Sequence, residues 1–300
     1  MNYFWDLFLG GMTRGSIYAL IALGYTMVYG ILELINFAHG EIYMIGAFTA
    51  LIVASVLTMH GLTGIAVLIA ATIVAVLYAA AYGFSVEKIA YKPLRQAPRL
   101  SPLISAIGMS IFLQNYVMLA QTSDFLPFPD LLEDFELPEA LSNWIAPSEF
   151  IIIFTAAVLM ICLTLILKFT KMGKAMRAVA QDREMAMLLG VNVNRIISRT
   201  FIIGSALAAI GGVLIASHVG RINFYIGFGA GIKAFTAAVL GGIGSIPGAM
   251  LGGLVLGLTE SFATGYISSD YENVFAFALL ILILIFKPEG ILGRSSQQKV

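Results

Sequence analysis

The stretch GILELINFAHGE, residues 30–41, places four polar side chains between two long apolar runs. Glu33, Asn36, His39 and Glu41 fall within nine consecutive residues. Two carboxylates that flank an imidazole have the groups of a proton relay, since a histidine can pass a proton between neighbouring acids. The sequence shows no second acid–base cluster that would extend such a relay. The role of these residues therefore depends on whether the stretch lies at the membrane surface or within the membrane.

Two interpretations of this stretch are open. If it lies at the end of a membrane span, Asn36 caps the next helix through its side-chain oxygen and Gly40 supplies flexibility. Glu33, His39 and Glu41 then sit at the wet interface. If the helix instead breaks within the membrane, the polar groups line a translocation pathway, because ionisable residues at membrane depth are expensive and usually functional. The pathway residues are then Asn36, His39, Gly40 and Glu41.

A second polar, glycine-broken stretch, GGIGSIPG at residues 241–248, lies near the other end of the chain. A pair of interrupted hydrophobic segments is typical of a substrate site in transporters. On that interpretation Gly242, Gly244 and Gly248 belong to the pathway as well. The two halves of the chain show no convincing sequence identity, so an internal repeat rests on this pair alone. The glycine spacing differs from that of dinucleotide-binding loops.

The composition predicts the class of protein. Hydrophobic residues make up 59% of the 300 residues, charged residues 11%, and the mean hydropathy is +0.93. Soluble domains carry about twice that share of charge. Apolar runs of about 20 residues match the hydrocarbon thickness of a bilayer, so we expect an all-α, polytopic membrane protein.

Several kinds of site are not expected. The formal net charge is zero, which argues against a nucleic-acid partner. The sole cysteine, Cys162, lies in an apolar run, where we expect a packing role. The three histidines are far apart in sequence and no Ser-His-Asp arrangement occurs, so neither a metal site, a cofactor nor a catalytic group is expected.

Nine segments are candidate membrane spans: 9–30, 41–59, 62–86, 102–121, 150–168, 197–217, 227–243, 247–265 and 272–287. The pair that covers residues 227–265 is rich in glycine, and Lys233 falls inside it. The alternative topology therefore has eight full spans and a re-entrant pair. Glu260 is another carboxylate within a span, and we expect it near an interface or bonded to a neighbouring helix.

The distribution of charge predicts the orientation, since positive charge marks cytoplasmic loops. The segments 87–100 and 168–199 and the C-terminal tail are basic. Their lysines and arginines are Lys88, Lys92, Arg95, Arg99, Lys168, Lys171, Lys174, Arg177, Arg183, Arg195, Arg199, Lys287, Arg294 and Lys299. The segment 122–149 has seven acids and no base, and is predicted to be periplasmic. Its acids are Asp124, Asp130, Glu133, Asp134, Glu136, Glu139 and Glu149. The assignments alternate if the N-terminus is periplasmic and the C-terminus cytoplasmic.

The basic loop 168–196 also holds a candidate docking element. Its residues favour helix, and five of them could share one apolar face: Met176, Val179, Ala180, Met187 and Leu188. A helix lying on anionic lipid would use the same basic residues. Glu184, Ala186 and Gly190 have the spacing E-x-A-x-x-x-G. This spacing resembles a loosened form of the EAA loop, through which permeases of ATP-binding-cassette (ABC) importers contact their ATPase subunits.

The chain as a whole resembles the branched-chain amino-acid permeases of ABC importers, and their Liv H-type subunit in particular. The resemblance is carried by four stretches: GSIYALIALGYTMVYGILELINFAHGEIYMIGAF (15–48), PLISAIGMSIFLQNYV (102–117), KAFTAAVLGGIGSIPGAMLGGLVLGL (233–258) and GILGR (290–294). It covers almost the whole chain and is weakest over the acidic loop 122–149. Related amide and urea permeases have close versions of NFAHGE and GGIGSIPGA.

The resemblance implies a single transmembrane permease domain, residues 1–300, with a fold similar to that of ribose-type permeases. It implies a bacterial inner-membrane importer with a second, unlike permease subunit of the Liv M type and two ATPase subunits. A periplasmic binding protein would deliver leucine, isoleucine or valine. Glu184, Ala186 and Gly190 would lie in the ATPase-coupling loop, and Asn36 to Glu41 and Gly241 to Gly248 match family signatures.

Other functions remain as alternatives at this point. A permease for a small amide or urea would have nearly the same sequence. An ion-coupled secondary transporter would need buried ionisable pairs in the spans, and an intramembrane enzyme would have to use His39 and Glu41. The chain contains no G-x-x-x-x-G-K-[ST] motif, so we expect ATP hydrolysis by separate subunits.

Overall fold

The fold is described from a computed structural model, which covers residues 3–98, 100–132, 135 and 137–293. Several charges used above to predict the orientation lie outside the described residues. They are Arg99, Glu133, Asp134, Glu136, Arg294 and Lys299.

The predicted all-α class is confirmed. The α-helices are α1 (Tyr3–Leu32), α2 (His39–Met59), α3 (Ile65–Val86), α4 (Leu100–Ala120), α5 (Glu139–Ser142), α6 (Pro147–Phe169), α7 (Lys171–Gln181), α8 (Arg183–Leu188), α9 (Val193–Val219), α10 (Ile226–Gly241), α11 (Ile246–Tyr266) and α12 (Glu272–Phe286). The segment after α3 continues as a π-helix, η1 (Glu87–Tyr91), and a 3-10 turn, η2 (Lys92–Leu94); a further 3-10 turn, η3 (Ser269–Tyr271), precedes α12. Two two-residue strands, β1 (Leu126–Pro127) and β2 (Arg221–Ile222), pair in antiparallel fashion.

Eight helical segments of the described chain are long and apolar enough to cross a membrane. The predicted span 227–243 is the exception, because α10 has 16 residues, fewer than the roughly 20 that a bilayer requires. Gly220 ends α9 in the left-handed conformation with φ +71°, and the chain then forms the pair of β2 with β1 before α10 begins. The alternative topology treats both helices of this pair as re-entrant. It is right about α10, which is too short to cross a membrane, and wrong about α11, which has 21 residues and is long enough.

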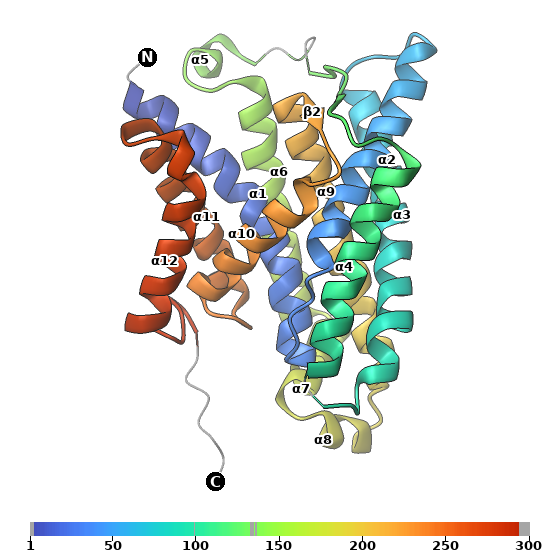
Figure 1. Cartoon of the computed structure of the whole chain (residues 1–300). Coiled ribbons are helices and arrows are strands. Elements are labelled where there is room, and N and C mark those ends of the chain that lie inside the picture. Colours follow the sequence, from blue (N-terminus) through green and yellow to red (C-terminus); the bar gives the residue numbers. More distant parts are fainter. Residues whose placement is uncertain (1–2, 99, 133–134, 136, 294–300) are drawn as a thin grey trace.

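The centre of the molecule is α1, which runs from the N-terminal end to the lower part of the fold (Figure 1). It packs closely against α11 because small residues face each other. The backbone of Gly15 contacts that of Leu254, and the backbone of Gly253 contacts that of Ala19. Close backbone approach through small residues is the usual way in which membrane helices gain van der Waals contact.

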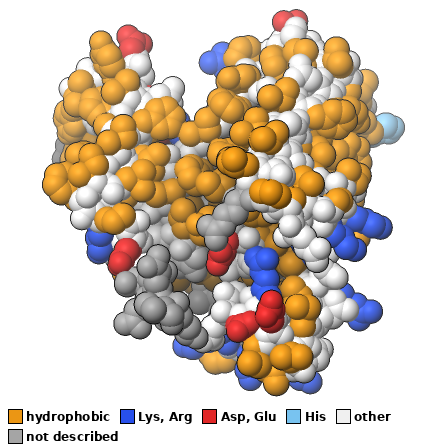
Figure 2. Space-filling model, turned by 60° about the horizontal axis from the view of Figure 1, so that its bottom comes forward, with side chains coloured by type: hydrophobic (Ala, Val, Ile, Leu, Met, Phe, Trp, Pro, Cys, Tyr) orange, Lys and Arg blue, Asp and Glu red, His pale blue; other side chains and the backbone are white. Residues whose placement is uncertain are grey.

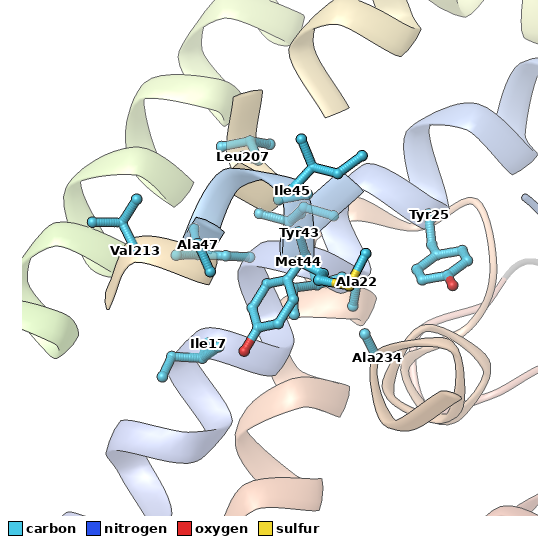
Figure 3. Packing of buried hydrophobic residues seen from close by; sticks show 14 of the residues in the cluster. Ile17, Ala22, Tyr25, Tyr43, Met44, Ile45, Ala47, Leu207, Val213 and Ala234 are labelled. Atoms are coloured by element: carbon cyan, nitrogen blue, oxygen red, sulfur yellow. The ribbon is translucent and has the colours of Figure 1, made fainter. Parts of the chain in front are cut away.

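The helix α9 packs on α1, α2 and α3 in the same manner. Its residues Gly204, Ala209 and Gly212 each face a glycine or the backbone of a neighbouring helix. Figure 3 shows the core that results, with Tyr43 and Met44 of α2 lying among aliphatic side chains of other helices.

The outer helices expose the large apolar side chains that a lipid surface would cover. On α12 they include Ile281, Leu282, Ile285 and Phe286, and α3, α4 and α6 present similar rows. Figure 2 shows these hydrophobic side chains spread over two lobes with a notch between them. Cys162 is exposed on α6, so the predicted packing role is wrong; it faces outward with the lipid-facing residues.

Candidate functional site

The helix α2 begins inside the fold. Residues 33–38 are not helical, and Figure 1 shows them running from the lower end of α1 up to a start of α2 well above it. Asn36, His39, Gly40 and Glu41 are all buried, whereas Glu33 is exposed. The break between α1 and α2 therefore lies inside the protein, and a role of these residues in a translocation pathway stays a prediction. The placement of His39 and Glu41 at a wet interface is wrong.

Asn36 does not cap α2. The N-cap residue is Ala38, which has no side-chain group that could accept a hydrogen bond. The Asn36 side chain instead turns toward η1, where the Tyr91 hydroxyl donates to Asn36 Oδ1 over 2.6 Å. This bond holds the non-helical segment against the end of α3, and it leaves the Asn36 amide nitrogen without a partner among the described residues.

The imidazole of His39 lies in a niche that glycine creates. Its ring is next to Gly24 of α1, where any Cβ would collide with it, and it meets the Tyr25 ring edge to face with centroids 4.9 Å apart. Its Nε2 has no hydrogen-bond partner in the described part of the chain. No hydrogen bond between His39 and Glu41 is found among these residues, so the geometry does not form the proton relay that their spacing suggests.

The Glu41 carboxylate lies where two helices begin. The Ser110 hydroxyl of α4 donates to its Oε1 over 3.0 Å, and its Oε2 lies beside Gly227 in the first turn of α10. Gly40 packs directly on the backbone of Gly227 and Gly231. The N-termini of α2 and α10 therefore meet inside the protein. Because a helix N-terminus carries partial positive charge, a carboxylate between two of them is stabilised.

The glycines of GGIGSIPG form a tight turn at the other end of α10. Gly242 and Gly244 have φ of +103° and +90°, and the Ser245 hydroxyl accepts a hydrogen bond from the amide of Gly248. The amides of Ile291 and Leu292 donate to the carbonyls that end α10, over 2.8 and 2.9 Å. The C-terminal segment thus closes this turn.

The pathway residues Asn36–Glu41 do not meet the predicted glycines, although the two stretches touch at one point, where a Cβ on Gly30 would lie 3.8 Å from the Cα of Gly244. The start of α2 contacts the first turns of α10, whereas Gly242, Gly244 and Gly248 lie beyond its last residue. A helix of 16 residues separates them by about 24 Å. The partners that do surround the start of α2 are Tyr91, Ser110, Gly227 and Gly231. They were missed because contacts between distant segments leave no local pattern in a sequence.

The basic loop consists of two short helices, α7 and α8, rather than one. Asp182 lies between them in an extended conformation with φ −158°, and its carboxylate accepts a hydrogen bond from the Met185 amide. The predicted single apolar face is therefore wrong: Met176 and Val179 are buried, while Met187 and Leu188 face outward.

The predicted coupling residues lie at the tip of this loop. Glu184 is exposed, Ala186 is buried, and Gly190 has φ +82° with open space around it. Leu188 and Leu189 beside them are 82% and 76% exposed. Figure 2, in which the underside comes forward, shows hydrophobic and basic side chains together at the lower edge of the molecule. The tip of the loop is therefore an apolar surface flanked by charge.

Two arginines connect this loop to the helices above it. The Arg183 guanidinium donates to the carbonyl of Ile31 at the end of α1, with Nε 3.0 Å away. Arg95 donates to Asn194 Oδ1 in the loop and contacts the buried Glu87, whose other oxygen accepts from the Ser198 hydroxyl over 2.8 Å. Burial lowers the pKa of Arg95, and the Glu87 carboxylate opposes that shift.

Two cavities open beside these arginines. One of about 700 Å³ is lined by Arg95, Arg183, Glu184 and Gly190, among others, and one of about 380 Å³ adds Glu33 at the end of α1. Arg95 was counted in the sequence only as a loop charge. The contact from Arg183 to Ile31 connects the loop to the end of α1, which the segment before α2 follows directly.

The chain is similar to known proteins along its whole length. Residues 7–284 match the family model described as "Branched-chain amino acid transport system / permease component". The chain is 50% identical to the "High-affinity branched-chain amino acid transport system permease protein LivH" of Escherichia coli (strain K12), over 99% of this chain and 98% of that protein. It is 52% identical to the corresponding permease protein BraD of Pseudomonas aeruginosa, over 97% and 96%. A shorter similarity, 28% over 40% of this chain and 39% of that protein, links it to the "Ribose import permease protein RbsC" of Haemophilus influenzae.

Proposed function

The chain belongs to the family of branched-chain amino acid transport system permease components, and we propose that it moves leucine, isoleucine and valine across the bacterial inner membrane as the permease subunit of an ABC importer. The observation that carries this proposal is the 50% identity to LivH over 99% of the chain. Because the alignment covers 99% of the chain, the similarity concerns the whole permease rather than one motif.

We assign ATP hydrolysis to partner subunits. The sequence has no phosphate-binding motif of the G-x-x-x-x-G-K-[ST] kind, and the chain resembles permeases rather than ATPases. The proposed complex has a second, unlike permease, two ATPase subunits and a periplasmic binding protein. Selectivity among the amino acids rests largely with the binding protein, which meets the substrate first.

The proposed orientation places the N-terminus in the periplasm and the C-terminus in the cytoplasm. The acidic segment 122–149 then faces the periplasm, and the basic loop 168–196 faces the cytoplasm. The pairing of β1 with β2 supports the alternation of sides, because it joins two segments that this topology assigns to the same side. The contact of Arg183 with Ile31 likewise joins two segments that both lie on the proposed cytoplasmic side.

The loop tip at Glu184–Gly190 is the proposed docking point for the ATPase. When ATP closes the ATPase dimer, the loop moves, and Arg183 transmits that motion to Ile31 at the end of α1. Residues 33–38 follow directly and carry it to the start of α2. This transmission requires a contiguous set of contacts that has two stable arrangements. Switching between the two arrangements opens the pathway alternately to each side of the membrane.

The junction of α2 and α10 is the proposed moving part of the pathway. The unpaired atoms of Asn36, His39 and Glu41 lie there, and helix N-termini can receive the carboxylate end of a zwitterion without adding full charges. The turn at Gly242, Gly244 and Gly248 holds the other end of α10 and lets that helix shift. The direct contacts of Gly40 with α10 support this arrangement.

Complementation tests the proposal. The chain, expressed with its partners in a bacterium that lacks its own branched-chain permease, should restore uptake of radiolabelled leucine. Uptake of urea or a short amide in place of leucine would favour the alternative substrate class. Uptake that persists without the ATPase subunits would favour the ion-coupled alternative.

A further inference from the structure

Four charged residues from four different helices form one cluster, in which Glu260 is buried and the side chains of Arg14 and Glu272 are 41% and 28% exposed. Lys233 of α10 contacts both Glu260 of α11, with Nζ to Oε1 3.3 Å, and Glu272 at the start of α12. Arg14 of α1 lies 3.7 Å from the other oxygen of Glu272. Two positive and two negative charges therefore balance. The expectation that Glu260 is bonded to a neighbouring helix is confirmed, since the Tyr18 hydroxyl also donates to it over 2.8 Å.

This charge cluster, Arg14, Lys233, Glu260 and Glu272, is costly for a membrane protein. The side chain of Glu260 is completely buried and that of Lys233 is 13% exposed. Buried ion pairs seldom stabilise a fold more than apolar residues of similar size would. Glu260 Oε1, although close to Lys233, has no hydrogen-bond partner among the described residues. Charged residues within membrane helices often mark substrate pathways.

A cavity of about 290 Å³ opens directly on the cluster. Arg14, Lys233 and Asn273 form its polar edge, and Ile17, Ile215 and Ile226 are among the apolar residues opposite. Tyr43 joins the same wall, and Figure 3 shows its hydroxyl directed toward Ile17. The volume lies near the lower end of small-molecule sites, about 300 Å³. This charged edge and aliphatic wall would match a small ligand that has charged groups at one end and an aliphatic side chain at the other.

We propose that this cavity is a transit site for the zwitterionic amino acid, a proposal that rests on the function proposed above. The substrate carboxylate binds Arg14 and Lys233, which line the cavity, and its ammonium group pairs with Glu272, which precedes the lining residue Asn273 and is 28% exposed. Glu260, which does not line the cavity, holds Lys233 in position. The branched side chain lies against the isoleucine wall. The zwitterion carries no net charge, so none is added to the membrane interior when the site fills.

Neutral substitutions separate a binding role from a structural one. We would compare Lys233→Met, Glu260→Gln and the double variant Lys233→Met/Glu260→Gln, with Lys88→Met as the matched control at an exposed lysine. Each would be reconstituted with both partner types and binding protein. ATP-driven leucine uptake and binding-protein-stimulated ATP hydrolysis would be measured on the same preparations, and co-purification of the ATPase would report assembly.

The expected result is a loss of leucine uptake of about tenfold or more in all three variants, while the double variant assembles and hydrolyses ATP as the wild type does. The single variants leave one charge unpaired, whereas the double variant leaves none. If the pair were only structural, the double variant would recover uptake, and that recovery would overturn the proposal. A wild-type complex without ATP-driven leucine uptake would instead overturn the function on which the proposal rests.

Photo-crosslinking gives a test that needs no variant. A diazirine analogue of leucine, activated during ATP turnover of the wild-type complex, should label peptides that contain Ile17, Ile215 or Ile226. Excess leucine should compete with this labelling. Reproducible, competed labelling confined to other parts of the chain, or none in this chain under turnover, would overturn the proposal.

Discussion

Gly40 of α2 and Gly227 of α10 lie in direct backbone contact, so that two helices begin against each other in the interior of the protein. Any side chain at Gly40 would meet the Gly227 carbonyl. Around this contact the protein gathers Asn36, His39 and Glu41, which have atoms without hydrogen-bond partners in the described chain. The contact is the centre of the proposed transport mechanism.

Gly40→Ala should therefore impair transport. The added methyl group forces α2 and α10 apart, and overpacking of a tight interior costs about 1–3 kcal/mol. We expect at least tenfold lower leucine uptake and a lower melting temperature for the purified complex. Gly108→Ala is the matched control, because Gly108 lies in α4 with nothing near its Cβ position. Equal uptake by the two variants would show that the contact is not needed.

The Tyr91–Asn36 hydrogen bond should contribute measurably to the thermal stability of the complex. Tyr91→Phe leaves a buried oxygen unpaired, which costs about 1–3 kcal/mol. We expect the melting temperature of the complex to fall by several degrees. Tyr271→Phe, at an exposed tyrosine, should leave it unchanged. A stable Tyr91→Phe variant would mean that the segment before α2 is held by other contacts.

Gly190→Arg should abolish co-purification of the ATPase or coupled transport. The residue has φ +82°, a conformation that side-chain-bearing residues adopt at a cost of about 1 kcal/mol, and the arginine would project from the proposed docking tip. Gly220→Arg makes a close control, since Gly220 also has positive φ and open space but lies on the proposed periplasmic side. Normal assembly and uptake with Gly190→Arg would remove the loop from the mechanism.

Arg183→Gln should uncouple hydrolysis from transport. The guanidinium bond to the Ile31 carbonyl joins the loop to α1, and hydrogen bonds to charged groups are worth about 1.5–3 kcal/mol. We expect ATP hydrolysis near the wild-type rate and leucine uptake reduced about tenfold. The control is Arg199→Gln, at an exposed arginine of α9. If hydrolysis and uptake fell together, Arg183 would serve assembly rather than transmission.

Composition and apolar run length were sufficient to predict the class of fold and most of the spans. They left open whether segment 227–243 spans the membrane, and could not decide that α10 is short. The shortening depends on Ile222 pairing with Leu126, almost 100 residues earlier in the chain, and no local pattern records that pairing. The same holds for the charge cluster: Lys233, Glu260 and Glu272 look like isolated exceptions in the sequence, and only the packing of three helices makes them neighbours.

The polar stretch before α2 was recognised in the sequence, but its depth was not. Hydropathy gives the same profile for a turn at the membrane surface and for a break inside the protein. Burial of His39 follows from Gly24, which leaves room for the ring, and from Tyr91, which holds Asn36. Both come from other segments of the chain, so the sequence could not show that Asn36 does not cap α2 or that His39 is buried.

The most direct test of the proposed function is leucine uptake into proteoliposomes that contain this chain, its partner permease and the ATPases, with binding protein added outside. Uptake would be compared with ATP inside, without ATP, and with an ion gradient alone. We predict uptake that requires both ATP and binding protein. Uptake that an ion gradient drives without ATP would contradict the ABC importer, and the acids around His39 would then have to be interpreted as an ion site.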